Sequence, residues 1–244
     1  PAQASGRAYV VNRGSNSVSV IDTATQQVIK TIEVGTAPVA LALTPDESKV
    51  YVVNRGSHNV SVITTATLQV TTTISVGFGP AAILITPTGQ RAYVANRDEV
   101  PNGTVSVLNP TTDTLLDTLP AYRPFPSVLA LSPAGTVLFV LGPGSRFVGV
   151  VDTTTNQVAR IEIDDDPVAV AFSPDGRRAY IANQGGNTVV VLDITTFPPT
   201  KLTEVPVGQG PNSLVVSPDG HKVYVANPLD SSLSIIPTAA TQTS

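Results

Sequence analysis

The feature that most constrains the fold of this chain is an internal repeat. Residues 9–22 read YVVNRGSNSVSVID and residues 51–64 read YVVNRGSHNVSVIT, so nearly the same letters return 42 positions later. An aromatic anchor marks six such repeats, spaced 41 to 46 residues apart: Tyr9, Tyr51, Tyr93, Phe139, Tyr180 and Tyr224. A repeat of this length predicts a modular architecture in which each unit packs against its neighbours.

Each repeat contains four short runs rich in valine, isoleucine, threonine and tyrosine. A proline-led run such as PVALAL is followed by a Pro-Asp-Gly type of turn, a YVVN-like run, an SVSVID-like run and a run such as QVIKTIEVG. Between these runs there is no ten-residue pattern typical of a helix. Four strands in about 40–45 residues are typical of a propeller blade. The sequence therefore predicts an all-β propeller of six four-stranded blades, in a single domain over residues 1–244.

The repeat pattern is least regular at the two ends of the chain, where the predicted ring must close. The chain starts just before a second strand and ends just after a third strand. PAQAS at residues 1–5 is a candidate remnant of an inner strand, and TAATQTS at residues 238–244 is a candidate outer strand. Because unclosed ends leave open strand edges, we expect the N- and C-terminal segments to share one composite blade. A truncated seven-bladed ring is the alternative.

The stretches YVVN, YVAN and YIAN, preceded by Pro-Asp-Gly-like turns and followed by VSVID-like strands, resemble the YVTN repeats. The resemblance covers residues 7–236, and LFVLGPGSRFVGVVD in the fourth repeat departs most from the pattern. It implies a bacterial or archaeal β-propeller that is secreted, periplasmic or attached to the cell surface. The matching letters build the blades, so the resemblance implies no particular ligand.

Composition excludes several classes of protein. Charged residues make up 13% of the chain, hydrophobic residues 41%, and the formal net charge is -4, which argues against a disordered tail and against a nucleic-acid partner. The absence of cysteine excludes disulfides and thiolate metal sites. No run approaches about 18 apolar residues, so no membrane span is expected. Because the chain begins at Pro1 and contains no methionine, we expect a processed or excised piece.

Loops on the two faces of the predicted propeller differ in character. In a four-stranded meander, the first-to-second and third-to-fourth loops share one face, and they vary little between repeats. The second-to-third loops on the other face read NRGSN, NRGSH, NRDEVPNG, LGPGSR, NQGGN and NPLDSS. The blade-to-blade loops share this face and read GTA, GFG, AYRPF, DDD and GQG. Variation on a regular scaffold is where a specific site can be built, so the sequence predicts the binding site on this variable face.

The variable face carries five of the ten arginines and none of the four lysines. Arginine can donate two hydrogen bonds to one carboxylate or phosphate, and aromatic residues could form a wall beside the bound anion. The expected partner is a small anionic molecule, a glycan or a protein. The predicted ligand-binding residues are Arg13, Arg55, Arg97, Tyr122, Arg123, Phe125 and Arg146. In the alternative interpretation, the arginines pair internally with acids of the same face: Asp98, Glu99, Asp164, Asp165, Asp166 and Asp230.

Few residues could support chemistry beyond binding. Asp164, Asp165 and Asp166 could give oxygen ligands to calcium, but the spaced calcium loop is absent and a solvated acidic loop is the alternative. His58, next to Ser57, is a weak candidate for a catalytic base. Asparagines that end equivalent strands suggest either a ring of ligands or, more simply, satisfied turn amides: Asn12, Asn54, Asn96, Asn183 and Asn227.

The sequence thus favours an extracytoplasmic binding or interaction module that needs no cofactor. A lactonase- or lyase-like enzyme acting at the channel mouth is the second hypothesis, and a structural component of a surface layer is the third.

Overall fold

The computed structural model describes residues 6–97, 103–121, 125–163 and 166–241. This part of the chain contains 22 β-strands and two short 3-10 helices. The chain divides into two compact units. Unit 1 comprises Pro1–Glu99 and Val105–Thr118, and unit 2 comprises Val100–Thr104 and Leu119–Ser244. The single-domain organisation stays a prediction.

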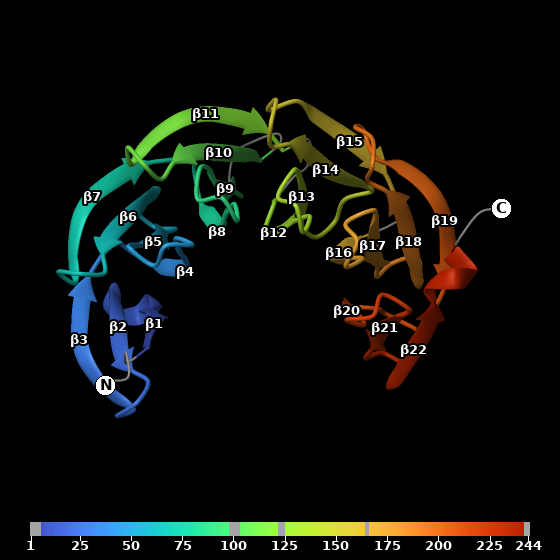
Figure 1. Ribbon diagram of the computed structural model, residues 1–244, viewed down its shortest axis with the longest axis horizontal. Helices are drawn as coiled ribbons and strands as arrows, with labels where there is room; N and C mark the ends of the chain where they lie inside the picture. Colours follow the sequence, from blue (N-terminus) through green and yellow to red (C-terminus); the bar gives the residue numbers. More distant parts are fainter. Residues whose placement is uncertain (1–5, 98–102, 122–124, 164–165, 242–244) are drawn as a thin grey trace. The chain divides into compact units, whose positions relative to one another are not determined.

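Unit 1 is built around three antiparallel sheets whose strands follow one another in chain order (Figure 1). The helix η1 (Arg13–Ser15) connects the first two strands. The first sheet contains β1 (Arg7–Asn12), β2 (Ser17–Asp22) and β3 (Gln27–Glu33). The second contains β4 (Pro38–Leu43), β5 (Lys49–Asn54), β6 (Asn59–Thr64) and β7 (Gln69–Ser75). The third contains β8 (Pro80–Ile85), β9 (Ala92–Asn96), β10 (Thr104–Asn109) and β11 (Thr114–Pro120).

Unit 2 is built on the same plan, and η2 (Thr238–Thr241) follows its last strand. Its first sheet contains β12 (Val128–Leu131), β13 (Val137–Leu141), β14 (Phe147–Asp152) and β15 (Val158–Glu162). The second contains β16 (Pro167–Phe172), β17 (Arg178–Asn183), β18 (Thr188–Asp193) and β19 (Thr200–Pro206). The third contains β20 (Ser213–Val216), β21 (Lys222–Asn227) and β22 (Ser232–Pro237).

The repeated sequence stretch corresponds to a repeated pair of strands. Its first copy forms β1 and β2, and its second copy forms β5 and β6. The register is also repeated, because Asn12 lies opposite Ser17 and Asn54 lies opposite Asn59. The prediction of an all-β fold made of short meandering strands is therefore confirmed, and the sheets are consistent with the blades of a β-propeller.

The terminal sheets differ from the predicted four-stranded pattern. In the part of the chain that is described, β1–β3 and β20–β22 form two separate three-stranded sheets, so a composite sheet shared by the two ends is not confirmed. Residues 1–5, one candidate for closure, lie outside the described residues. The described part of the other candidate is not a strand, because Thr238–Thr241 forms the 3-10 helix η2. The Ala-Ala pair in this segment lacks the β-branched residues that favour a strand.

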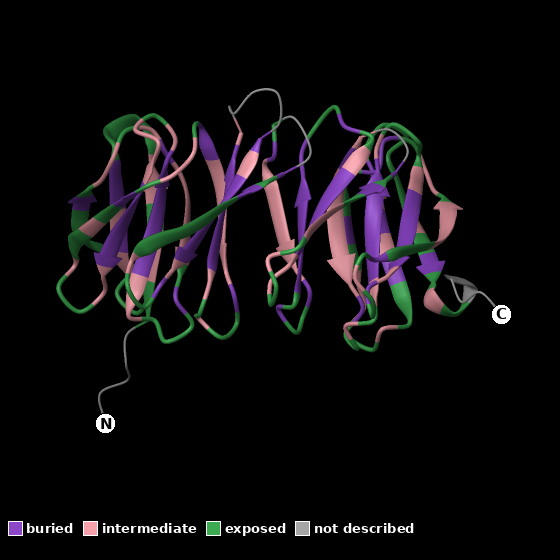
Figure 2. Cartoon of the chain, turned by 90° about the horizontal axis from the view of Figure 1, so that it is seen from above, coloured by how far each residue is buried: buried purple, intermediate pink, exposed green. Residues whose placement is uncertain are grey.

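The core of each unit lies between successive sheets. Alternate side chains of a strand point to opposite faces, so one strand serves two clusters. On β5, Val50 and Val52 pack with Val18 and Val20 of the preceding sheet, whereas Tyr51 and Val53 pack toward the following one. In Figure 2 the buried residues lie along the strands, and the loops at both strand ends are largely exposed.

The last sheet of unit 2 has one face that its neighbour does not cover. Ile235 on β22 lies opposite Tyr224, just as Val191 on β18 lies opposite Tyr180. Ile235 is nevertheless 53% exposed, whereas Val191 is 0% exposed. Leu233 and Val215 are exposed to a similar extent, at 61% and 59%. The apolar pattern is thus the same in both sheets, and within unit 2 only the β16–β19 sheet of this pair has a following sheet that covers it.

Candidate functional site

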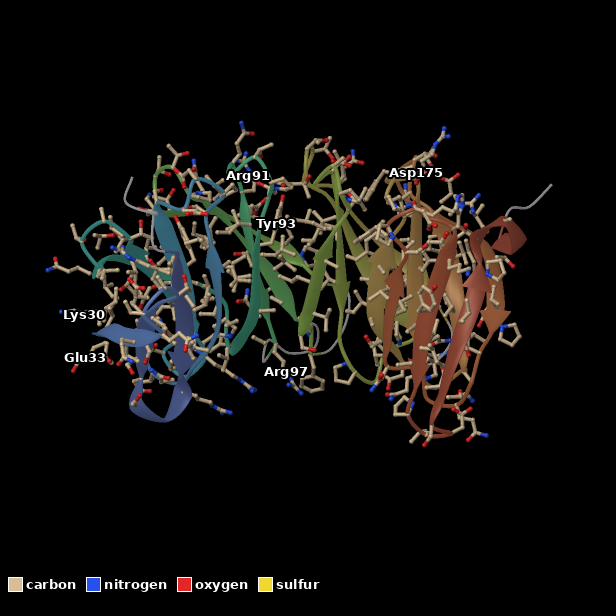
Figure 3. The ribbon with its side chains drawn as sticks, turned by 60° about the horizontal axis from the view of Figure 1, so that its bottom comes forward. Lys30, Glu33, Arg91, Tyr93, Arg97 and Asp175 are labelled. Carbon is tan, nitrogen blue, oxygen red and sulfur yellow. The ribbon has the colours of Figure 1, made fainter. Side chains whose placement is uncertain are left out.

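The meander places two kinds of loop at opposite edges of each sheet. In a four-stranded sheet, we call the edge with the first-to-second and third-to-fourth strand hairpins the corner edge, and the edge with the remaining loops the variable edge. In the three-stranded sheets, the β2–β3 hairpin and the β20–β21 hairpin lie on the corner edge, so the β1–β2 loop lies on the variable edge. Figure 3 shows this arrangement on β9, where Arg91 and Arg97 lie at opposite ends with Tyr93 between them. Arg91 belongs to the corner edge and Arg97 to the variable edge. The sequence-based division of the loops into two sets is therefore reproduced in unit 1.

Three predicted binding residues occupy equivalent places at the variable edge of unit 1. Arg13, Arg55 and Arg97 each follow the last residue of a strand that carries an aromatic anchor. The backbone NH of Arg55 donates to the Ala37 carbonyl at 3.0 Å, and that of Arg97 donates to the Gly79 carbonyl at 3.1 Å. These bonds tie each arginine backbone to the loop that precedes its sheet. Arg13 is exposed, whereas Arg55 and Arg97 are half-buried.

His58, the candidate base, fastens two loops of the variable edge together. Its Nδ1 accepts a hydrogen bond from the backbone NH of Gly79 at 3.1 Å. Its ring packs edge-on against Phe78, with 5.0 Å between the ring centroids. Because Nδ1 is already an acceptor, the neutral ring carries its proton on Nε2. These contacts give His58 a structural role, and catalysis by this residue stays a prediction.

The variable edge of unit 2 contains the other predicted residues that the structure describes. Phe125 is 48% exposed, and Arg146 is also exposed. Asp166 links two loops, because its Oδ1 accepts from the Gly144 NH at 2.8 Å and its own NH donates to the Ser145 carbonyl at 3.1 Å. Tyr122, Arg123, Asp164 and Asp165 lie outside the described residues. Within the described ranges, no group of three or more potential metal ligands comes together.

The asparagines at the strand ends have structural contacts. Their side-chain amides donate to serine or threonine hydroxyls of the adjacent strand, at 2.9 Å from Asn54 to Ser61 and at 2.9 Å from Asn227 to Ser234. The same pattern includes Asn12 with Ser19, Asn96 with Ser106 and Asn183 with Thr188. These bonds join the strand that carries the aromatic anchor to the strand that follows it, which supports the interpretation that the asparagines build the repeat.

A cavity lies at the corner edge of unit 2, where the sequence predicted no site. Its volume is about 720 Å³, within the range of about 300–1,000 Å³ typical of small-molecule sites. Two arginines and a histidine face it together with three aspartates: Arg177, Arg178, His221, Asp175, Asp193 and Asp219. Asp175 is labelled in Figure 3 in the hairpin between β16 and β17. A smaller cavity of about 340 Å³ lies at the corner edge of unit 1, beside Lys49.

Local hydrogen bonds keep the corner aspartates ionised. The hydroxyl of Ser173 and then the backbone NH of Arg177 lower the pKa of Asp175 below its usual value. The hydroxyl and backbone NH of Thr195 likewise lower the pKa of Asp193. Asp219 has its pKa lowered in the same way by the Ser217 hydroxyl and the His221 NH. The cavity therefore combines fixed negative charges with the positive charges of two guanidinium groups.

Sequence reasoning overlooked this cavity because the corner turns look uniform from repeat to repeat. One signal was present: Arg177 and Arg178 are adjacent, and His221 occupies the equivalent turn of the next repeat. Adjacent residues on a strand point to opposite faces, so only the packing of the two sheets could show that all three side chains line one cavity.

Comparison with protein families identifies the class of domain. The domain family described as "Choice-of-anchor I domain" matches residues 57–201, which is 145 of the 244 residues. No curated protein matches the sequence significantly.

Solved structures of similar fold cover nearly the whole chain. Hydrazine synthase of Kuenenia stuttgartiensis is 24% identical with a TM-score of 0.56, over 96% of this chain and 92% of that one. A functionally unknown protein of Desulfotomaculum acetoxidans is 24% identical with a TM-score of 0.71, over 95% and 79%. The dihydro-heme d1 dehydrogenase NirN is 17% identical with a TM-score of 0.76, over 98% and 53%. At these identities the similarity supports the fold alone.

Proposed function

Because this chain belongs to the Choice-of-anchor I domain family, a match that points to a secreted or cell-surface protein, we propose that it is a ligand- or partner-binding module that works outside the cytoplasm. A periplasmic location is included in this proposal. Neither of the two described helices has the length and hydropathy that would carry the chain through a bilayer.

The proposed recognition surface is the variable edge, and its ligand is anionic. One observation carries this proposal: Arg13, Arg55 and Arg97 recur at one position of three successive sheets of unit 1. Bonds to neighbouring loops hold the backbone of two of them in place. A fixed backbone reduces the entropy that a binding side chain loses, and guanidinium groups suit carboxylates and phosphates. In unit 2 the proposal extends to Tyr122, Arg123, Phe125 and Arg146.

Removal of two of these charges tests the proposal. A panel of small carboxylates, phosphates and acidic glycans is screened by the shift in thermal unfolding temperature. The double variant Arg55→Gln, Arg97→Gln should lose the shift that an anion produces. The double variant Arg7→Gln, Arg91→Gln is the matched control, because it removes two positive charges from the corner edge of the same unit. An equal loss of the anion-induced shift in both variants would show that only the net charge of the protein matters, and would contradict the proposal. If no probe shifts the unfolding temperature, the structural surface-layer hypothesis is favoured.

We also propose that the six sheets are the six blades of one YVTN-type propeller. The support is the repeated packing of one sheet's tyrosine-bearing face against an aliphatic face of the next, seen separately in each unit. A single domain of this kind should unfold in one calorimetric transition with equal calorimetric and van't Hoff enthalpies. Two separate transitions would contradict the proposal.

A further inference from the structure

The corner cavity of unit 2 has a counterpart in unit 1 that indicates which chemical group fits it. The first residue of the strand bearing the aromatic anchor is basic at both places. In unit 1, Lys49 Nζ donates to the Pro110 carbonyl at 2.9 Å. In unit 2, Arg178 Nη1 donates to the Thr238 carbonyl at 3.3 Å. The basic side chain therefore reaches the same turn of the next sheet in each unit.

In unit 1, that turn also delivers a carboxylate. Asp113 forms an ion pair with Lys49 at 2.8 Å and accepts a hydrogen bond from the Tyr51 hydroxyl. Tyr180 of unit 2 is the equivalent of Tyr51, and it lines the corner cavity beside Arg178. The corresponding turn, residues 237–241, reads PTAAT and contains no carboxylate. The cavity there is about 720 Å³, about twice the 340 Å³ found in unit 1. A carboxylate from outside the chain could thus approach Arg178 and Tyr180 as Asp113 approaches Lys49 and Tyr51, with the difference that Asp175 and Asp193 also act electrostatically on Arg178.

The rest of the cavity wall offers hydrogen-bond acceptors. Asp175 accepts from Ser173 and Arg177 through Oδ1 alone, and Asp193 accepts from Thr195 through Oδ1 alone. Asp219 uses Oδ1 for Ser217 and His221. The Oδ2 atoms of these three side chains therefore make no hydrogen bond within the described residues. A carboxylate has two acceptor oxygens, and hydroxyl groups of a ligand are suitable donors for the second.

We propose that this corner cavity binds an acidic sugar, a uronic acid, with its carboxylate directed toward Arg178 and Tyr180 and its hydroxyls toward the aspartates. The carboxylate of the ligand suits the basic side chains of the cavity wall, and its hydroxyls suit the acidic side chains. A simple anion would bring its charge near three aspartates without offering them donors, so it should bind less well. A neutral sugar would lack the group that suits the guanidinium of Arg178. The site is independent of the variable edge, because it lies at the other end of the strands.

Two-dimensional amide NMR of the full chain with galacturonate as the probe tests this inference. Added galacturonate should shift the amide signals of Gly176 and Gly220, whose hairpins border the cavity. Glucose and acetate should each bind at least about tenfold more weakly, since each lacks one half of the interactions. Arg178→Gln should weaken galacturonate binding about tenfold or more. Arg91→Gln, the same change at the corner edge of unit 1, should leave binding unchanged.

Further variants separate the possible outcomes. Asp193→Asn should weaken galacturonate more than acetate, and it keeps the inference testable if Arg178→Gln disturbs folding. Arg55→Gln with Arg97→Gln should leave galacturonate binding intact, which distinguishes this site from the variable edge. Equal affinity for acetate, phosphate or glucose would overturn the inference. So would signal changes confined to residues other than the two hairpins, or no change at all at high galacturonate concentration.

Discussion

The hydroxyl of Tyr51 donates a hydrogen bond to the carboxylate of Asp113, which belongs to the next sheet of unit 1. Burial, then the hydrogen bond and the negative charge of Asp113, raise the pKa of Tyr51 well above its usual value. Lys49 completes the group, because its Nζ lies 2.8 Å from Asp113 Oδ2. This contact joins the aromatic anchor of one repeat to the hairpin of the following repeat.

Removal of the Tyr51 hydroxyl should therefore weaken unit 1. A hydrogen bond to a charged group contributes about 1.5–3 kcal/mol, so Tyr51→Phe should lower the free energy of unfolding by about that amount. Urea denaturation measures it. The double-mutant cycle with Asp113→Asn should give a coupling energy above about 0.5 kcal/mol, whereas strict additivity would show that the two groups do not interact.

Acid should destabilise the protein through its hairpin aspartates. Hydrogen bonds from Thr44 and Ser48 lower the pKa of Asp46 from 3.8 to about 2. Between these two values the unfolded chain binds more protons than the folded chain, so stability rises with pH there and is lost as pH falls from about 4 toward 2. Asp175, Asp193 and Asp219 act in the same direction. Urea denaturation midpoints at pH 6, 4, 3 and 2 measure this loss of stability. The series spans pH 4 because the ordinary carboxylate pKa is about 4. Asp46→Asn should show a shallower pH dependence than the unmodified chain, and a steeper one would contradict the assignment.

The uncovered face of the last sheet gives a prediction about packing. Val191 is 0% exposed, so Val191→Thr should cost about 1–3 kcal/mol because it buries a hydroxyl. Val215 is 59% exposed, so the same substitution there should stay within about 0.5 kcal/mol. Equal costs at the two positions, measured by urea denaturation, would mean that another surface covers the face in solution.

Gly142 determines the path of the loop that carries Phe125. A β-carbon at Gly142 would lie 2.2 Å from the Phe125 carbonyl oxygen, which is backbone and cannot rotate away. Gly142→Ala should therefore destabilise unit 2 by about 1–3 kcal/mol and shift this loop. Gly14→Ala is the control, because a β-carbon at Gly14 would meet no atom within 4 Å. Unfolding by urea compares the two variants, and similar small effects would contradict the close approach.

The sequence by itself determined the strands, the turns and the two loop edges. Alternation along runs such as KVYVVN, and turn residues at fixed positions, are local properties that repeat with the chain, so β5 and β6 could be predicted from their letters alone. The aromatic anchors were recognisable for the same reason.

Only the tertiary structure decided which side chains meet across sheets. Tyr51 and Asp113 are separated by 62 residues, and no local pattern pairs them. The corner cavity depends on Arg178, Asp193 and His221 being brought together from different strands and hairpins. The exposure of Ile235 depends on whether a sheet follows its own, although its letters match those of a buried strand. Repetition specifies each sheet locally, whereas cavities and exposed faces arise from how neighbouring sheets differ, which is a property of their contacts.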